Sequence, residues 1–113
     1  MPHFVIEYSK DLEPDVAPET LMTAAHEVGI ASQLFEGPDI KVRLIPVGYS
    51  LVAGKRASSL HITIYLLSGR NQATKKALTQ AFVEAFEPLV PTCESVSANA
   101  IDMDRQTYSK IIR

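Results

Sequence analysis

Hydrophobic and polar residues alternate in two stretches of the chain, and this period of two predicts β-strands. In residues 2–8, Phe4, Ile6 and Tyr8 fall on one face. Residues 60–67, rich in Ile, Thr and Tyr, give the strongest strand signal. The stretches 40–49 and 95–104 are also predicted as strands, with an edge or a bulge at Pro46 because proline cannot donate to a sheet.

Two other segments have the spacing of helices. Residues 14–29 place Leu21, Ala25 and Val28 at i, i+4 and i+7, and Gly29 is expected near the end of that helix. Residues 72–89 repeat the spacing of three and four more regularly. Either Ser68 or Asn71 is expected to cap this second helix, and Pro88 and Pro91 close it. Residues 50–59 are small and polar, which predicts a loop or hairpin.

The order of elements is a repeated β-α-β unit. The matching pairs are strands 2–8 and 60–67, helices 14–29 and 72–89, and strands 40–49 and 95–104. Because each crossover is right-handed, we expect an α+β fold with a four-stranded sheet and both helices on one face. The other face is then uncovered. Val5, Ile45 and Ile62, or their neighbours of opposite parity, must be buried there, which predicts an oligomer.

Composition narrows the class of protein. The chain has 113 residues with 46% hydrophobic residues, so we expect one domain spanning 1–113. A net charge of −2 argues against non-specific nucleic-acid binding. No apolar stretch approaches the roughly 20 residues of a membrane helix, and no signal-peptide pattern opens the sequence. The single cysteine, Cys93, excludes an internal disulfide. We expect a cytoplasmic protein.

Pro2 is the most informative candidate for chemistry. Methionine before a small second residue is normally removed, which would leave proline as a secondary amine. Such an amine has a pKa near ~8, and modest burial or nearby cations bring it to neutrality. A base of that strength suits proton abstraction next to a carbonyl. The alternative is that Pro2 merely suits the position after the initiator.

Three short segments add a resemblance to this layout: MPHFVIE at the start, IKVR at residues 40–43 and HITIYLLSGR at residues 61–70. Together with the duplication they resemble the tautomerase superfamily, and the chain is most similar to its 5-carboxymethyl-2-hydroxymuconate isomerase family. The resemblance implies a homotrimer without a cofactor. It also implies a general base at Pro2, and arginines at Arg43 and Arg70 that hold the carboxylates of a small-molecule substrate.

Elementary electrostatics also favours an anion site at the two arginines. Arg43 lies in an apolar strand, where its guanidinium needs a carboxylate or water; a salt bridge with Glu7 or Asp39 is the alternative. Arg70 stands at the start of a helix, where a bound anion is favoured; the alternative is a solvated turn residue. Lys41 shares the parity of Arg43 and is a further substrate-binding candidate, or else a surface lysine.

The main hypothesis is a cofactor-independent isomerase that moves a proton in an unsaturated 2-hydroxy or 2-oxo carboxylic acid. One alternative is a non-catalytic trimer that binds a small ligand on the same scaffold. A weaker one is a ferredoxin-like enzyme that uses His3 or His61. No metal is expected, because the three histidines lack metal-ligand spacing. Residues 108–110 are expected in a C-terminal arm that contacts a neighbouring subunit.

Overall fold

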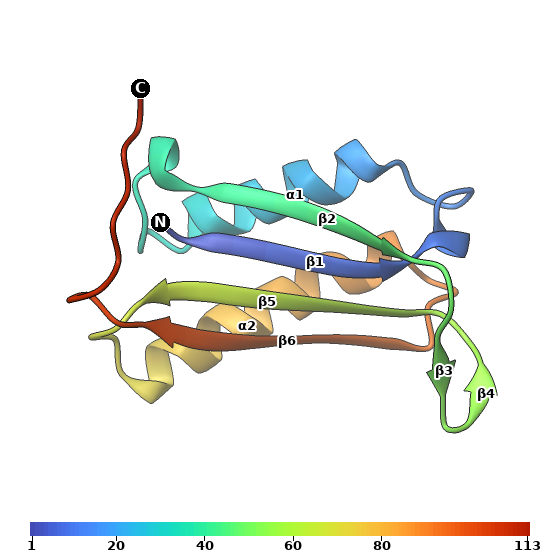
Figure 1. The fold of residues 1–113 in the computed structure, drawn as a ribbon. Coiled ribbons are helices and arrows are strands. Elements are labelled where there is room, and N and C mark those ends of the chain that lie inside the picture. The colour runs from blue at the N-terminus through green and yellow to red at the C-terminus, as the bar shows by residue number, and fades with distance from the viewer.

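A four-stranded mixed sheet forms the body of the protein in the computed structural model, which describes residues 1–113 (Figure 1). Its strands are β1 (His3–Ser9), β2 (Lys41–Val47), β5 (Ser59–Leu67) and β6 (Ser95–Met103), in the order β2-β1-β5-β6. β1 pairs parallel with β2, and β5 pairs parallel with β6. The two β-α-β units therefore meet at the antiparallel pair of β1 and β5.

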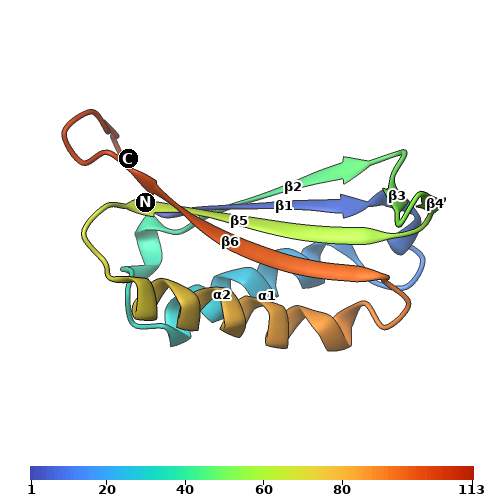
Figure 2. The ribbon, with the colours of Figure 1, turned by 90° about the horizontal axis from the view of Figure 1, so that it is seen from below.

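Two helices cover one face of the sheet and leave the other face bare (Figure 2). They are α1 (Pro18–Ala31) and α2 (Gln72–Phe86). Three short 3-10 turns complete the connections: η1 (Lys10–Leu12), η2 (Gly37–Asp39) and η3 (Glu87–Leu89). This arrangement confirms the predicted α+β fold class. Neither α1 nor α2 is long and apolar enough to cross a membrane.

The small polar segment between the units forms a hairpin of β3 (Leu51–Val52) and β4 (Lys55–Arg56). Ala53 and Gly54 at its tip have positive φ angles of 55° and 76°. Two successive left-handed residues are typical of the two-residue turns whose twist matches that of paired strands. The hairpin lies at the end of the sheet opposite the amino terminus (Figure 1).

The expected first helix was wrong at both ends. The chain first makes η1, and α1 begins at Pro18, whose fixed φ suits a first helical position. The helix runs past Gly29 to Ala31. A Cβ atom at Gly29 would lie 2.9 Å from both Cδ1 of Ile40 and Cε2 of Phe4. Glycine is therefore required for close packing of helix on sheet, and it does not end the helix.

The second helix begins as expected. The side chain of Asn71 accepts a hydrogen bond from the backbone N–H of Thr74 at 2.8 Å, so Asn71 and not Ser68 is the N-cap. The helix is regular to Phe86, and η3 follows it. The predicted end at residue 89 thus includes one 3-10 turn.

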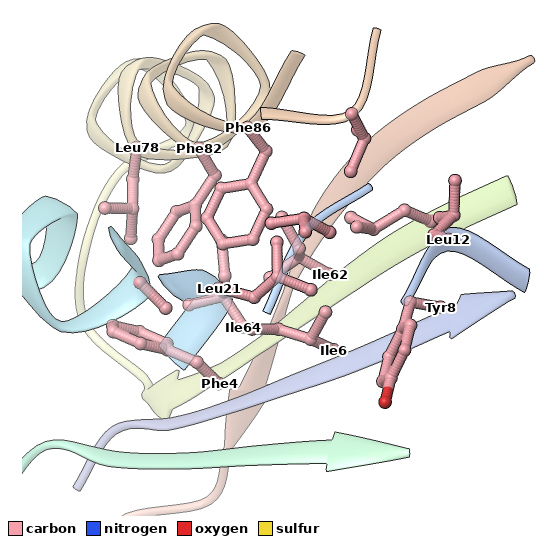
Figure 3. Close-up of a cluster of buried hydrophobic side chains, with 14 of the residues drawn as sticks. Phe4, Ile6, Tyr8, Leu12, Leu21, Ile62, Ile64, Leu78, Phe82 and Phe86 are labelled. Atoms are coloured by element: carbon pink, nitrogen blue, oxygen red, sulfur yellow. The ribbon is translucent and has the colours of Figure 1, made fainter. Parts of the chain in front are cut away.

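The core fills the space between the sheet and the two helices (Figure 3). It contains 15 buried hydrophobic residues. The strands supply Phe4, Ile6, Tyr8, Leu60, Ile62, Ile64 and Leu66, and the helices supply Leu21, Ala25, Leu78, Phe82 and Phe86. The rings of Phe4 and Phe82 meet edge to face with centroids 4.8 Å apart, a favoured aromatic geometry. This contact ties β1 to α2.

The bare face of the sheet differs in part from expectation. Ile62 is paired with Ile6, and both are fully buried on the helix side, so on β5 the stated alternative holds and the neighbours of opposite parity face outward. Ile45 and Ile101, on the two outer strands, remain 45% and 40% exposed. These isoleucines are the large apolar side chains that an oligomer would cover.

Candidate active site

Pro2 directly precedes β1, an inner strand of the sheet, and we call the surroundings of this strand's first residues the amino-terminal corner; Figure 1 marks the N-terminus there. Its side chain is fully buried, and its carbonyl accepts a hydrogen bond from the backbone N–H of Lys41 at 3.0 Å. That bond extends the β1–β2 pairing by one residue, so Pro2 is held by the sheet. In the 113-residue chain its nitrogen is an amide, because Met1 precedes it.

The terminal amine of Met1 lies at the same corner and donates to the carbonyl of Asp39 at 2.9 Å. Burial, together with the neighbouring ammonium groups of Lys41 and Lys110, lowers the pKa of this amine to about 5. The carboxylate of Asp39 opposes them weakly. This corner therefore favours a neutral amine at physiological pH.

Lys41 supplies a buried cation beside that amine. It pairs with His3 across β1 and β2, and its Nζ atom is buried without a hydrogen-bond acceptor in the chain. An ammonium group left unpaired away from water is costly. An anion that reached this corner would relieve that cost, so Lys41 fits an anion-binding role better than that of a surface lysine.

Arg43 lies one pleat further along β2 and is exposed. Its Nη1 atom is 3.0 Å from Nδ1 of His3. The alternative, a salt bridge from Arg43 to Glu7 or Asp39, is wrong, because Arg43 forms no ion pair. Asp39 pairs with Lys110 instead, at 2.7 Å. The remaining donors of the guanidinium are open to solvent.

His3 connects this group to the end of the chain. Its Nε2 atom is 2.9 Å from the hydroxyl of Tyr108, and the two rings meet edge to face. Burial lowers the pKa of His3, and the charges of Arg43, the terminal amine and Lys41 act in the same direction. A neutral imidazole is the form that this surrounding favours.

The segment after β6 folds back over the amino-terminal corner (Figure 1). Tyr108 reaches His3, and Nζ of Lys110 reaches Oδ1 of Asp39 at 2.7 Å. We expected these residues to contact a neighbouring subunit, whereas within one chain they contact its own amino terminus. The contacts span 105 and 71 positions of sequence, so no local pattern pointed to them.

Arg70 has different partners. Its Nη2 donates to the carbonyl of Leu34 at 2.8 Å, and its Nη1 donates to the carbonyl of Leu67 at 3.3 Å. The guanidinium also lies over the ring of Phe35. The alternative of a solvated turn residue is therefore wrong. Pro2, Lys41, Arg43 and His3 come together around the start of β1 and β2, and no contact of Arg70 joins it to them.

Other candidates have structural roles. On the bare face, His61 is bonded to Ser97 at 2.7 Å and to Asn99 at 2.9 Å, which satisfies both ring nitrogens. Burial raises the pKa of the Cys93 thiol, which favours the unreactive protonated form. No three His, Cys, Asp or Glu side chains are placed to hold a metal ion. None of the five principal cavities of the single chain is lined by Pro2.

Comparison with known proteins identifies relatives over nearly the whole chain. A family model described as 5-carboxymethyl-2-hydroxymuconate isomerase matches residues 2–110. A search of curated protein sequences found no match.

Solved structures share the fold at low sequence identity. A 5-carboxymethyl-2-hydroxymuconate isomerase from Deinococcus radiodurans R1 is 20% identical, with a TM-score of 0.81 over 99% of this chain and 90% of that chain. A 5-carboxymethyl-2-hydroxymuconate delta-isomerase is 17% identical, with a TM-score of 0.77 over 100% of this chain and 89% of that chain. A fused 4-OT symmetric trimer is 18% identical, with a TM-score of 0.83 over 96% of this chain and 90% of that chain.

Proposed function

Because the chain belongs to the 5-carboxymethyl-2-hydroxymuconate isomerase family, we propose that it is a cofactor-independent isomerase of unsaturated 2-hydroxy or 2-oxo carboxylic acids. The amine of Pro2, freed by removal of Met1, is the general base. One observation carries this proposal: Pro2 is buried and held by its bond to Lys41 at a corner where burial and nearby cations lower the pKa of a terminal amine, here that of Met1. A neutral amine next to a bound carbonyl compound can accept a proton at neutral pH.

The reaction moves one proton from one carbon of the substrate to another, so the substrate neither gains nor loses atoms. The Pro2 nitrogen takes a proton from a carbon next to the carbonyl, and the electron pair of that C–H bond moves into a dienolate. The same nitrogen then returns the proton to a different carbon of the conjugated system. The double bond has moved, and the enzyme is unchanged. This sequence requires no oxidant, metal or organic cofactor.

Cations near the base suit an acidic substrate. Lys41 offers a buried ammonium group without a partner, and Arg43 offers exposed guanidinium donors at the same end of β2. In the proposal they hold a carboxylate and stabilise the negative charge of the dienolate. Arg70 enters the proposal through the family resemblance. Two of its N–H groups already donate to carbonyls, so it would bind anions through those that remain.

We propose that the active form is a homotrimer. The bare face of the sheet, with exposed Ile45 and Ile101, is the surface to be covered. The fused 4-OT structure of the same fold is described as a symmetric trimer, which supports this assembly. Light scattering of the purified protein should give three times the chain mass of 12.4 kDa. A monomer would contradict this part of the proposal.

The second candidate function is a non-catalytic binding protein on the same scaffold. It is favoured by one observation, that Met1 fits the corner with its amine bonded to the carbonyl of Asp39. A chain that kept Met1 would have an amide at Pro2 and no base there. Lys41 would still attract a carboxylate.

One experiment separates the two candidates. The intact mass of the untagged protein is measured before and after treatment with 3-bromopyruvate, which alkylates a free amine and releases bromide. The isomerase predicts a chain without Met1 and a single adduct at Pro2, together with turnover of 5-carboxymethyl-2-hydroxymuconate. Retained Met1, or a free Pro2 that stays unlabelled without turnover, would favour the binding protein. A variant with Ala inserted before Pro2 is the matched control, since it blocks the proline nitrogen only.

A further inference from the structure

Three side chains form a continuous hydrogen-bonded row at the amino-terminal corner. Nη1 of Arg43 is 3.0 Å from Nδ1 of His3, and Nε2 of His3 is 2.9 Å from the hydroxyl oxygen of Tyr108. The row joins β2, β1 and the segment after β6. The hydroxyl of Tyr108 has no other hydrogen-bond partner in the chain.

The chemistry of these groups fixes the direction of each bond. A guanidinium group only donates, so Nδ1 of His3 must accept from Arg43 and carries no proton. The single proton of the neutral imidazole is then on Nε2, which donates to the oxygen of Tyr108. Because that oxygen accepts from His3, the hydroxyl hydrogen of Tyr108 is free to donate to a third group.

Tyr108 is held at the corner where the base lies. His3 directly follows Pro2 in the chain. Two positions beyond Tyr108, Lys110 is paired with Asp39, whose carbonyl receives the terminal amine of Met1. The carboxy-terminal segment is thus attached to the amino-terminal corner at two points, by Tyr108 to His3 and by Lys110 to Asp39.

We propose that Tyr108 is a further substrate-contacting residue, whose hydroxyl donates a hydrogen bond to an oxygen of the substrate bound at Pro2. His3 is a positioning residue that keeps the Tyr108 hydroxyl turned to donate. A donor aimed at the oxygen on which charge develops stabilises the dienolate more than the substrate, and so it accelerates proton transfer. This inference rests on the proposed function of Pro2.

The variant Tyr108→Phe tests the donor, since it removes only the hydroxyl of a half-buried ring. We expect kcat/KM for 5-carboxymethyl-2-hydroxymuconate to fall about tenfold or more, the loss typical of one hydrogen bond that strengthens in the transition state. The rate of Pro2 alkylation by 3-bromopyruvate and the circular dichroism spectrum should stay unchanged. Tyr49→Phe is the matched control, because Tyr49 is 85% exposed at the far end of the sheet.

Two variants of His3 test the positioning. In His3→Gln the amide nitrogen can donate to Tyr108 in place of Nε2, so activity should be within about threefold of the wild type. In His3→Leu that donor is lost, and kcat should fall as far as in Tyr108→Phe. The groups that face His3 are Arg43, Lys41, the terminal amine and Tyr108.

The outcomes distinguish this inference from the proposed function. If the wild type is labelled at Pro2 and turns over substrate, and Tyr108→Phe has unchanged kcat and KM, only the role of Tyr108 is overturned. If the wild type shows neither labelling nor turnover, the proposed function fails, and the role of Tyr108 falls with it. Equal loss of activity in His3→Gln and His3→Leu would overturn the positioning role of His3.

Discussion

The guanidinium carbon of Arg70 lies 5.1 Å from the centre of the Phe35 ring, so the turn before α2 is stacked on the segment that follows α1. The same guanidinium donates to the carbonyl of Leu34. Phe35 in turn meets Phe4 edge to face, with centroids 5.9 Å apart. Arg70 thus connects the two β-α-β units on the helix side of the sheet.

We predict that Arg70→Met reduces stability. The carbonyl of Leu34 loses its donor and the cation–π contact is lost, so the free energy of unfolding should fall by about 1–3 kcal/mol. Urea denaturation measures this. Arg113→Met, which removes the same charge from an exposed position, should be neutral. A stable Arg70→Met protein with a much higher KM would instead assign Arg70 to the substrate.

Gly29→Ala should also destabilise the fold. The added methyl group would lie 2.9 Å from a ring carbon of Phe4 and 2.9 Å from the Cδ1 methyl group of Ile40. The side chain of Ile40 can move to another rotamer. The ring of Phe4 cannot move, because it packs against the rings of Phe35 and Phe82. We expect a loss of about 1–2 kcal/mol, after the gain in helix propensity from alanine. Gly48→Ala has open space around it and is the control. Equal thermal midpoints for the two variants would contradict the packing argument.

Lys41→Met separates stability from binding. Removing a buried, unpaired ammonium group should leave the free energy of unfolding unchanged or raise it by about 1 kcal/mol. The same change removes a cation from the proposed carboxylate site, so KM should rise about tenfold or more. Urea denaturation and steady-state kinetics measure the two effects. Marked destabilisation would show that the ammonium group has a structural partner.

Stability should depend on pH through His3. Its pKa is lowered in the folded protein by burial and by the charges of Arg43, the terminal amine and Lys41. The unfolded chain therefore binds the proton more readily, and stability rises with pH in that window. The contribution is complete above the unfolded pKa of about 6.5 and is lost as the pH falls through the lower folded pKa. His3→Gln should flatten this part of the curve measured by thermal unfolding from pH 4 to 8.

The sequence was sufficient for the layout of the fold. The alternation in residues 2–8 and 60–67 identifies β1 and β5, because each strand has one face in the core and one outside it. The regular spacing in residues 72–89 identifies α2 for the same reason. Gly29 was misread because glycine at a close approach and glycine at a helix end look alike in sequence.

The sequence predicts which residues of the site lie together only where they stand on the same strand or on two strands expected to pair. Pro2, Lys41 and Arg43 could be placed together because β1 and β2 were expected to pair. The parity of β1 also places His3 on the face of Lys41 and Arg43, opposite to the buried side chain of Pro2. Tyr108 could not be found, because its contact with His3 depends on how the chain turns after its last strand.

The antiparallel meeting of β1 and β5 gives the sheet a pseudo-twofold symmetry that its chemistry does not share. At the corner related to Pro2, the chain enters β5 through the peptide nitrogen of Ser59, which donates to the hydroxyl of Ser9 at 2.8 Å and cannot take up a proton. Substitutions there should affect folding alone, whereas those beside Pro2 should affect folding and turnover. Saturation mutagenesis of the sheet, scored separately for protein abundance and for catalysis, should therefore show two halves. Substitutions near the start of β5 should lower catalysis only as far as they lower abundance, whereas substitutions near Pro2 should lower catalysis further.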